Sequence, residues 1–241
     1  MGDLTYLLVG AATFLVARAR ANRQASGSTA TPNGPAHPSV PPTGSLPDVS
    51  PTDRVALIQS LWQNQIPGLD YVRYALHIGE RESGSKYRPK HEGARKLGYP
   101  LGMNDHGFSG MYQMGAQALE TQGYIKAGTW ARPGTGGNYK ILTTQANWTD
   151  KCPGGIEQFM NTPAIQEEAM LKMTRGNYRV LRSMGVLSDA SPASVKAGYL
   201  ASAHLKGPGG AAALARGDVQ ADAYGTRTDN YYRGGAASQV A

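Results

Sequence analysis

Cysteine and large aromatic residues are scarce in this sequence. Cys152 is the only cysteine among 241 residues, which excludes an intrachain disulfide and a cysteine-based metal site. We expect its side chain to act as a small buried hydrophobic group. Three Phe and three Trp stand beside thirteen Tyr and 31 Gly. This composition suits helices packed through small residues and a polar cleft better than a large aromatic core.

The chain also lacks the features of a nucleic-acid-binding protein. Its formal charge is +7, and a basic surface attracts polyanions such as nucleic acid, anionic lipid or a polymer rich in carboxylates and phosphates. The charges are spread along the chain, however, and no arginine-rich arm or nucleic-acid-binding motif is present. We therefore expect no nucleic-acid partner.

The one long apolar run, residues 4–17, has Asp3 and no Lys or Arg before it, and Arg18, Arg20 and Arg23 after it. A bilayer span usually needs about 20 apolar residues, so this run is short. Charge placement predicts that the N-terminus lies outside and the arginines inside. We expect residues 1–21 to be an uncleaved membrane anchor. The alternative is a signal peptide cleaved at the Ala-Arg-Ala steps of residues 17–21.

Residues 22–50 are rich in Pro, Ser, Thr and Gly and nearly free of large apolar side chains. Such a segment cannot offset its ordering entropy by burial, so a disordered linker is expected. The remaining part, residues 51–235, is expected to fold as one domain. An anchor followed by a flexible linker implies a head that searches a nearby surface.

Apolar residues in the folded part recur at helical spacing, and alternation with a period of two is nowhere sustained. Caps and breaks predict helices over residues 51–66, 70–83, 163–185 and 192–207. The third is expected to bury a stripe formed by Ile165, Ala169, Met173, Val180 and Met184. The glycine-rich middle has room for a short hairpin. The expected class is mainly α (α+β): a helical bundle with a small loop or hairpin lobe.

One carboxylate falls on the buried stripe of the second helix. Tyr71, Ala75, Ile78 and Glu82 follow one another at steps of four, three and four, whereas Glu80 faces water. Partial burial and the negative end of the helix dipole both disfavour the charged form of Glu82. A carboxylic acid kept protonated near neutral pH is what protonating a glycosidic oxygen requires.

The same position has a purely structural interpretation. Glu82 would then serve only to cap its helix or to pair with Arg73 or Arg81. Ser83-Gly84 ends the helix under either interpretation, because Gly is the usual residue just past a C-terminus.

Three ordered segments within residues 55–210 resemble the signature of lytic transglycosylases of the soluble, goose-lysozyme-like type. They are Glu82-Ser83-Gly84, Gly110-Met111-Tyr112-Gln113, and residues 203–209, which read Ala-His-Leu-Lys-Gly-Pro-Gly. The family pattern is Glu-Ser on a helix, a Gly-Leu-Met-Gln turn and an Ala-Tyr-Asn-Ala-Gly-Pro-Gly turn. The resemblance implies a lysozyme-like fold, with Glu82 as the single catalytic acid/base and with Ser83 and Gln113 at the sugar cleft.

The chain departs from the family pattern at several positions. His204 stands where the family has Tyr, and Leu205 where it has Asn. The family tyrosine hydrogen-bonds the catalytic acid, so either His204 or Tyr199, one turn earlier, is expected at Glu82. The alternative for His204 is a helix-end residue favoured by the dipole. Tyr112 is a further departure, in the second segment, and it either offers a ring for a sugar to stack on or packs in the interior.

By this resemblance the chain cuts the MurNAc-GlcNAc β-1,4 bond of peptidoglycan as a lytic transglycosylase. A hydrolysing muramidase would need a second carboxylate, for which Asp105 and Glu92 are the candidates. Both are also explained as solvated loop residues. The trio Asn104, Asp105 and His106 is too small a group for a metal site, so neither a metal nor another cofactor is expected.

The alternative from another class is a non-catalytic protein that binds or clamps the cell wall.

A folded domain joined by a linker to a membrane anchor suits two settings: the virion of a bacteriophage that opens the wall during entry, or the periplasmic face of a bacterial envelope machine. The absence of a basic segment before residue 4 favours the phage setting. Residues 222–232 are Tyr-rich and are expected to pack beside the cleft.

Overall fold

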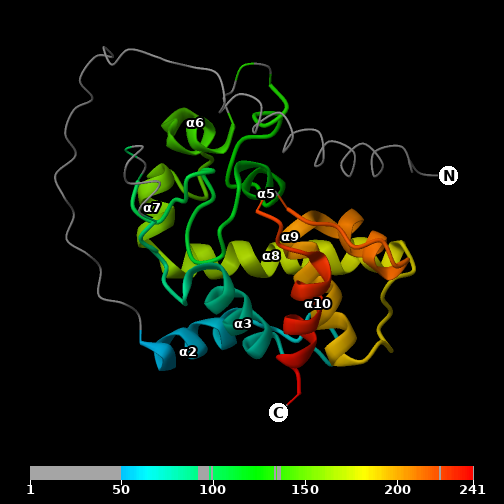
Figure 1. Ribbon diagram of the computed structural model, residues 1–241. Helices are drawn as coiled ribbons and strands as arrows, with labels where there is room; N and C mark the ends of the chain where they lie inside the picture. Colours follow the sequence, from blue (N-terminus) through cyan, green and yellow to red (C-terminus); the bar gives the residue numbers. More distant parts are fainter. Residues whose placement is uncertain are drawn as a thin grey trace. The chain divides into compact units, whose positions relative to one another are not determined.

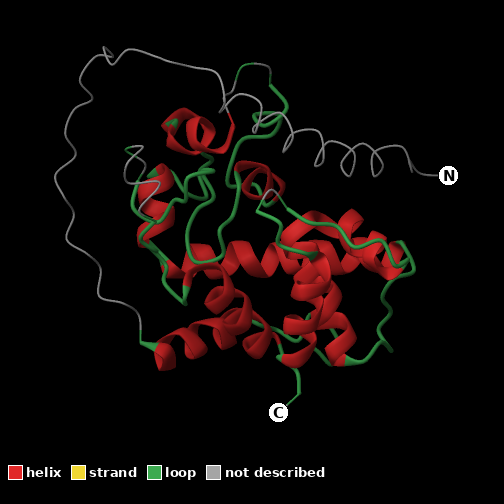
Figure 2. Ribbon diagram, viewed as in Figure 1, coloured by secondary structure: helices red, strands yellow, loops and turns green. Residues whose placement is uncertain are grey.

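The computed structural model describes residues 50–91, 98, 100–132, 134, 137–222 and 224–240. The expected anchor, residues 1–21, and almost all of the expected linker, residues 22–50, lie outside this part. Within the described residues the fold is helical, with isolated β-bridges and no named strand (Figure 2). The prediction of a mainly α protein is therefore confirmed. No helix in the described part is long and apolar enough to cross a membrane.

The helices follow one another in the order shown in Figure 1. Helix α8 lies across the middle, and α2, α5, α7 and α9 all pack against it. Helix α10 packs against α9 and α3. Their bounds are α2 Pro51–Leu61, α3 Tyr71–Ser83, α5 Ala116–Thr121, α6 Gly137–Thr143, the 3-10 helix η1 Gln145–Asn147, α7 Gly155–Asn161, α8 Pro163–Ser183, α9 Ala193–Ala215 and α10 Thr228–Ala237.

The first two helices begin within one residue of their predicted starts, each behind a capping side chain. The Ser50 hydroxyl accepts a hydrogen bond from the Asp53 amide, and the Asp70 carboxylate accepts one from the Arg73 amide. Gly84 ends α3 in the left-handed conformation, with φ of 60°. The prediction that the first helix reaches residue 66 is wrong. It ends at Leu61, because Trp62 turns to an extended conformation.

The buried stripe predicted for helix α8 is confirmed in part. Ala169 is buried and Ile165 and Met173 pack against the core, but Met184 is 46% exposed. The buried residues of α8 also include the polar Gln166, Glu167 and Thr174. Counting apolar residues alone missed these three, whose side chains find hydrogen-bond partners in other segments or, for Thr174, in the Met170 carbonyl of the same helix.

Gly207 breaks the helical conformation of α9, with φ of 72° and ψ of 171°, just before Pro208. The predicted break is thus confirmed, but a second helical segment continues to Ala215 instead of ending there. Small residues let α9 and α10 approach closely. A Cβ added to Gly235 of α10 would lie 2.5 Å from the Ala197 carbonyl oxygen of α9. This supports the prediction of helix packing through small residues.

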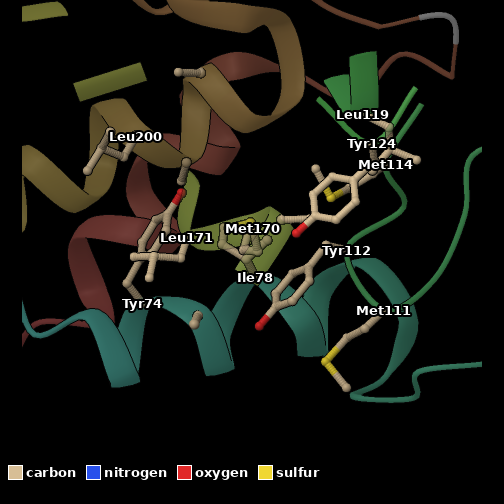
Figure 3. Packing of buried hydrophobic residues seen from close by; sticks show 14 of the residues in the cluster. Tyr74, Ile78, Met111, Tyr112, Met114, Leu119, Tyr124, Met170, Leu171 and Leu200 are labelled. Carbon is tan, nitrogen blue, oxygen red and sulfur yellow. The ribbon is translucent and has the colours of Figure 1, made fainter. Parts of the chain in front are cut away.

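The expected hairpin region forms tight turns. Ser109 bridges to Met103 on one side and to Met114 on the other. The core beneath these turns gathers side chains from distant segments, as Figure 3 shows for Ile78 of α3, Met170 of α8 and Leu200 of α9. Cys152 is buried, as expected, and burial raises the pKa of its thiol to about 11.

His77 packs α3 against α10 and makes the stability of the fold sensitive to acid. Its ring lies against Gly234, where an added Cβ would be 2.7 Å from Nε2. Burial lowers the pKa of His77 below its ordinary value of about 6.5, and the Arg81 cation acts in the same direction. The unfolded chain therefore binds more protons than the folded one just below pH 6.5, so stability falls as the pH drops through that range.

We expect His77→Gln to lose less stability than the wild type between pH 7 and pH 5. The measurement is the urea midpoint at both pH values, with the exposed His106→Gln as the control. An equal loss in all three proteins would contradict the role given to His77.

Candidate functional site

Glu82 lies in the last turn of α3, partly buried, as the helical spacing predicts. Its side chain is 15% exposed, whereas Glu80 is exposed to solvent. The Tyr231 hydroxyl donates a hydrogen bond of 2.6 Å to Oε1 of Glu82. Nε2 of His204 lies 3.3 Å from the same oxygen. Both contacts are made to Oε1.

Tyr231, on α10, was not among the residues predicted for the site. The only sequence signal was the Tyr-rich tail, which was expected to pack nearby. Burial raises the pKa of Tyr231, and the Glu82 carboxylate adds to the increase, so the phenol keeps its proton and acts as a donor. The Arg81 guanidinium lies over the Tyr231 ring, 4.0 Å from its centroid.

The structural alternative for Glu82, an ion pair with Arg73 or Arg81, is not supported. Arg73 pairs with Asp70 at 3.2 Å, and Arg81 packs on the ring of Tyr231. Among the described residues, the Glu82 carboxyl accepts a hydrogen bond from a phenol and lies close to an imidazole.

His204, on α9, lies beside two oxygen atoms. Its Nε2 is 3.1 Å from the Tyr112 carbonyl oxygen and 3.3 Å from Oε1 of Glu82. A carbonyl can only accept, so Nε2 carries a hydrogen and donates it to Tyr112, with the Glu82 oxygen as a close polar neighbour. Nδ1 is buried, and no described residue is its hydrogen-bond partner. The expected contact between His204 and Glu82 is therefore present.

Tyr199, the predicted alternative to His204, is not the residue that contacts Glu82. Its ring packs against the ring of Tyr232, with centroids 4.8 Å apart. The phenol that reaches Glu82 comes from Tyr231, next to Tyr232 in α10. Of these two neighbouring tyrosines, Tyr231 therefore contacts the Glu82 carboxyl of α3, and Tyr232 contacts the Tyr199 ring of α9.

The turn of residues 110–113 contacts the site mainly through its backbone, because the Tyr112 carbonyl accepts from His204. Tyr112 is only 1% exposed, so the prediction of a ring for sugar stacking needs correction: the ring packs in the interior. Gln113 adopts φ of 46°, and its amide Nε2 donates to the Gly110 carbonyl. Oε1 of Gln113 is buried and has no hydrogen-bond partner among the described residues. Ser83 bonds to the Gly79 carbonyl and accepts from the Lys86 amide, and so caps the end of α3.

Asp105 is exposed and accepts a hydrogen bond of 2.8 Å from the Tyr224 hydroxyl. Asn104 uses its side-chain oxygen to accept from the amides of His106 and Phe108, which makes it a turn residue. Within the described ranges, no group of three or more His, Cys, Asp or Glu side chains could hold a metal ion. Glu92, the other candidate second carboxylate, lies outside the described residues.

A second acidic residue is buried far more deeply than Glu82. Glu167 of α8 accepts hydrogen bonds from the phenols of Tyr87 and Tyr112, and from Nε of Arg54 at 3.2 Å. Burial alone would lower the pKa of Arg54, but Tyr112 and Glu167 outweigh it, so the net shift is upward. With its donors in place and about 1% of its surface exposed, Glu167 has no access to a substrate. Helical periodicity gave no sign of this ion pair.

Comparison with protein families, with curated proteins and with solved structures finds no match to this chain, so the functional argument rests on the site itself.

Proposed function

We propose that this protein is a lytic transglycosylase that cuts the MurNAc-GlcNAc β-1,4 bond of peptidoglycan on a lysozyme-like helical fold. The observation that carries the proposal is the partly buried carboxyl of Glu82, whose Oε1 accepts from Tyr231 and lies beside His204. A carboxyl fixed by one oxygen presents the other in a defined direction, as a general acid requires. The ordered likeness of residues 82–84, 110–113 and 203–209 to the family signature supports the same reaction.

In the first step the protonated Oε2 of Glu82 gives its proton to the glycosidic oxygen, and the bond from that oxygen to C1 of MurNAc breaks. The GlcNAc leaving group departs as an alcohol. Glu82, now a carboxylate, then takes the proton of the MurNAc 6-hydroxyl while O6 bonds to C1. The product is a 1,6-anhydro end, and Glu82 regains its proton. One carboxyl serves both steps, so no water and no second acid are consumed.

The contacts of two other acidic residues in the described part support the single-carboxylate mechanism. Glu167 is sealed inside the fold by its three donors. Asp105 is engaged by the Tyr224 hydroxyl on an exposed loop. Neither is among the partners of Glu82, whereas a hydrolase would need a carboxylate positioned to activate water at the same bond.

The proposal extends to the setting in which the head would work. Residues 1–21 would anchor the chain in a membrane and residues 22–50 would tether the head near the wall. This arrangement suits a bacteriophage virion or the periplasmic face of a bacterial envelope. The glycan strands of peptidoglycan are the proposed partner.

The test is mass analysis of the fragments that the full-length protein, in mild detergent, releases from purified peptidoglycan. We expect anhydro-muramic ends, because the 6-hydroxyl of the substrate closes the reaction in place of water. Reducing ends would overturn the transglycosylase in favour of a hydrolase, and Asp105→Asn would then be the next variant to assay. Binding to the wall without any release would leave the non-catalytic clamp as the better account.

A further inference from the structure

Two adjacent polar residues of α8 hold the turn of residues 109–114 from below. Oε1 of Gln166 accepts a hydrogen bond of 2.7 Å from the Met111 amide. Glu167 accepts one from the Tyr112 hydroxyl. The fit is close, since a Cβ added to Gly110 would lie 2.3 Å from the Gln166 oxygen. The backbone and the side chain of this turn are therefore both fixed by α8.

The phenol of Tyr112 is held from a second side by Arg54. The guanidinium donates to the Tyr112 oxygen at 3.1 Å, to the Ala75 carbonyl of α3 at 3.1 Å and to Glu167 at 3.2 Å. Gly79 of α3 leaves room for it: an added Cβ there would lie 2.4 Å from the guanidinium. The ion pair thus ties the turn to the same helix that carries Glu82.

The other end of Tyr112 faces the site. Its carbonyl oxygen is 3.1 Å from Nε2 of His204, the nitrogen that also lies 3.3 Å from Glu82. No described residue bonds to Nδ1 of His204, so the hydrogen bond to the Tyr112 carbonyl is the contact that orients the imidazole beside Glu82. A displaced Tyr112 would take the carbonyl away from the ring and leave the imidazole without this hydrogen bond.

We propose that Arg54 and Glu167 are positioning residues of the site: through the Tyr112 phenol they fix the carbonyl that holds the His204 imidazole against Glu82. The structural part of this inference stands without any activity. Its consequence for the reaction rests on the proposed function, because a misplaced His204 would let the Glu82 carboxyl turn away from the glycosidic oxygen.

Tyr112→Phe and Tyr87→Phe form a matched pair for the test. Each removes one phenol hydroxyl from Glu167 and keeps the ring, but only Tyr112 touches His204. The first measurement is the ¹⁵N chemical shifts of the histidine ring nitrogens in the full-length protein, with the His204 signals assigned by their loss in His204→Gln. We expect these shifts to move in Tyr112→Phe and to stay in place in Tyr87→Phe, while both variants lose a similar amount of thermal stability.

The second measurement is the rate of glycan cleavage. We expect kcat to fall about tenfold to a hundredfold in Tyr112→Phe, with KM little changed, because small displacements of reacting groups cost this much. Tyr87→Phe should stay near the wild-type rate. His204 shifts that are the same in both variants would overturn the inference, and so would altered shifts with an unaltered kcat.

A wild-type protein that cuts no glycan would sink the proposed function, and the ¹⁵N shifts would still decide the positioning role. Should Tyr112→Phe not fold, Arg54→Lys replaces it in both measurements. Lysine keeps the charge but cannot make the forked contacts of the guanidinium. Unmoved His204 shifts in that variant would count against the inference equally.

Discussion

Glu82→Gln is expected to lower the rate of glycan cleavage by about 10²- to 10⁴-fold, the usual contribution of a general acid/base. The amide oxygen of Gln still accepts the hydrogen bond that Tyr231 makes to Oε1, and it can lie beside His204 as Oε1 does. The fold and the bound geometry should therefore survive. What is lost is the proton at Oε2, because an amide neither delivers a proton to a leaving oxygen nor takes one from a hydroxyl.

The measurement is turbidity loss of a peptidoglycan suspension, together with the mass analysis of released fragments. Glu80→Gln is the matched control, since Glu80 lies on the same helix two residues earlier but is exposed and bonded to Ser85. It should keep near wild-type activity. Equal activity of Glu82→Gln and Glu80→Gln would remove Glu82 from the mechanism, whatever the products are.

Glu167→Gln is expected to cost about 3–5 kcal/mol of the free energy of unfolding, the range found when one partner of a buried ion pair is removed. Gln can still accept hydrogen bonds, but it leaves the Arg54 guanidinium as an uncompensated charge with about 4% of its side chain exposed. The measurement is urea unfolding followed by circular dichroism, with the linear extrapolation to water.

Glu168→Gln is the control for this second variant. Glu168 neighbours Glu167 on α8 but is 42% exposed and pairs with Lys172 one turn away. Its amide would still accept from the Tyr124 hydroxyl, so we expect a loss of about 0.5 kcal/mol or less, as for other surface pairs. A similar small loss for both variants would mean that water or a neighbouring group compensates Arg54.

The starts of the helices, the end of α3 and the direction of Glu82 were predictable because they depend on neighbours within one or two turns. Ser50 and Asp70 cap helices through amides three residues away. Gly84 ends α3 by adopting a backbone conformation that other residues avoid. The spacing of apolar residues along α3 was enough to place Glu82 inward and Glu80 outward, since a regular helix fixes the angle between them.

The partners of Glu82 were only partly predictable. His204 was expected there by resemblance, whereas Tyr231 is 149 residues from Glu82 along the chain and reaches it only because α10 packs against α3. The burial of the Tyr112 ring was equally difficult to predict. Its ring is buried by Arg54 and Glu167, which come from two helices more than a hundred residues apart.

The sequence by itself determined the helical class, the caps, the break at Gly207 and the inward carboxyl of α3, because each follows from local backbone preference or from helical period. Only the tertiary structure decided which polar residues of α8 are buried, which tyrosine holds Glu82 and which acid is sealed beside Arg54. Polar groups enter the interior when partners from other segments satisfy them, and the choice of partner depends on how the helices pack.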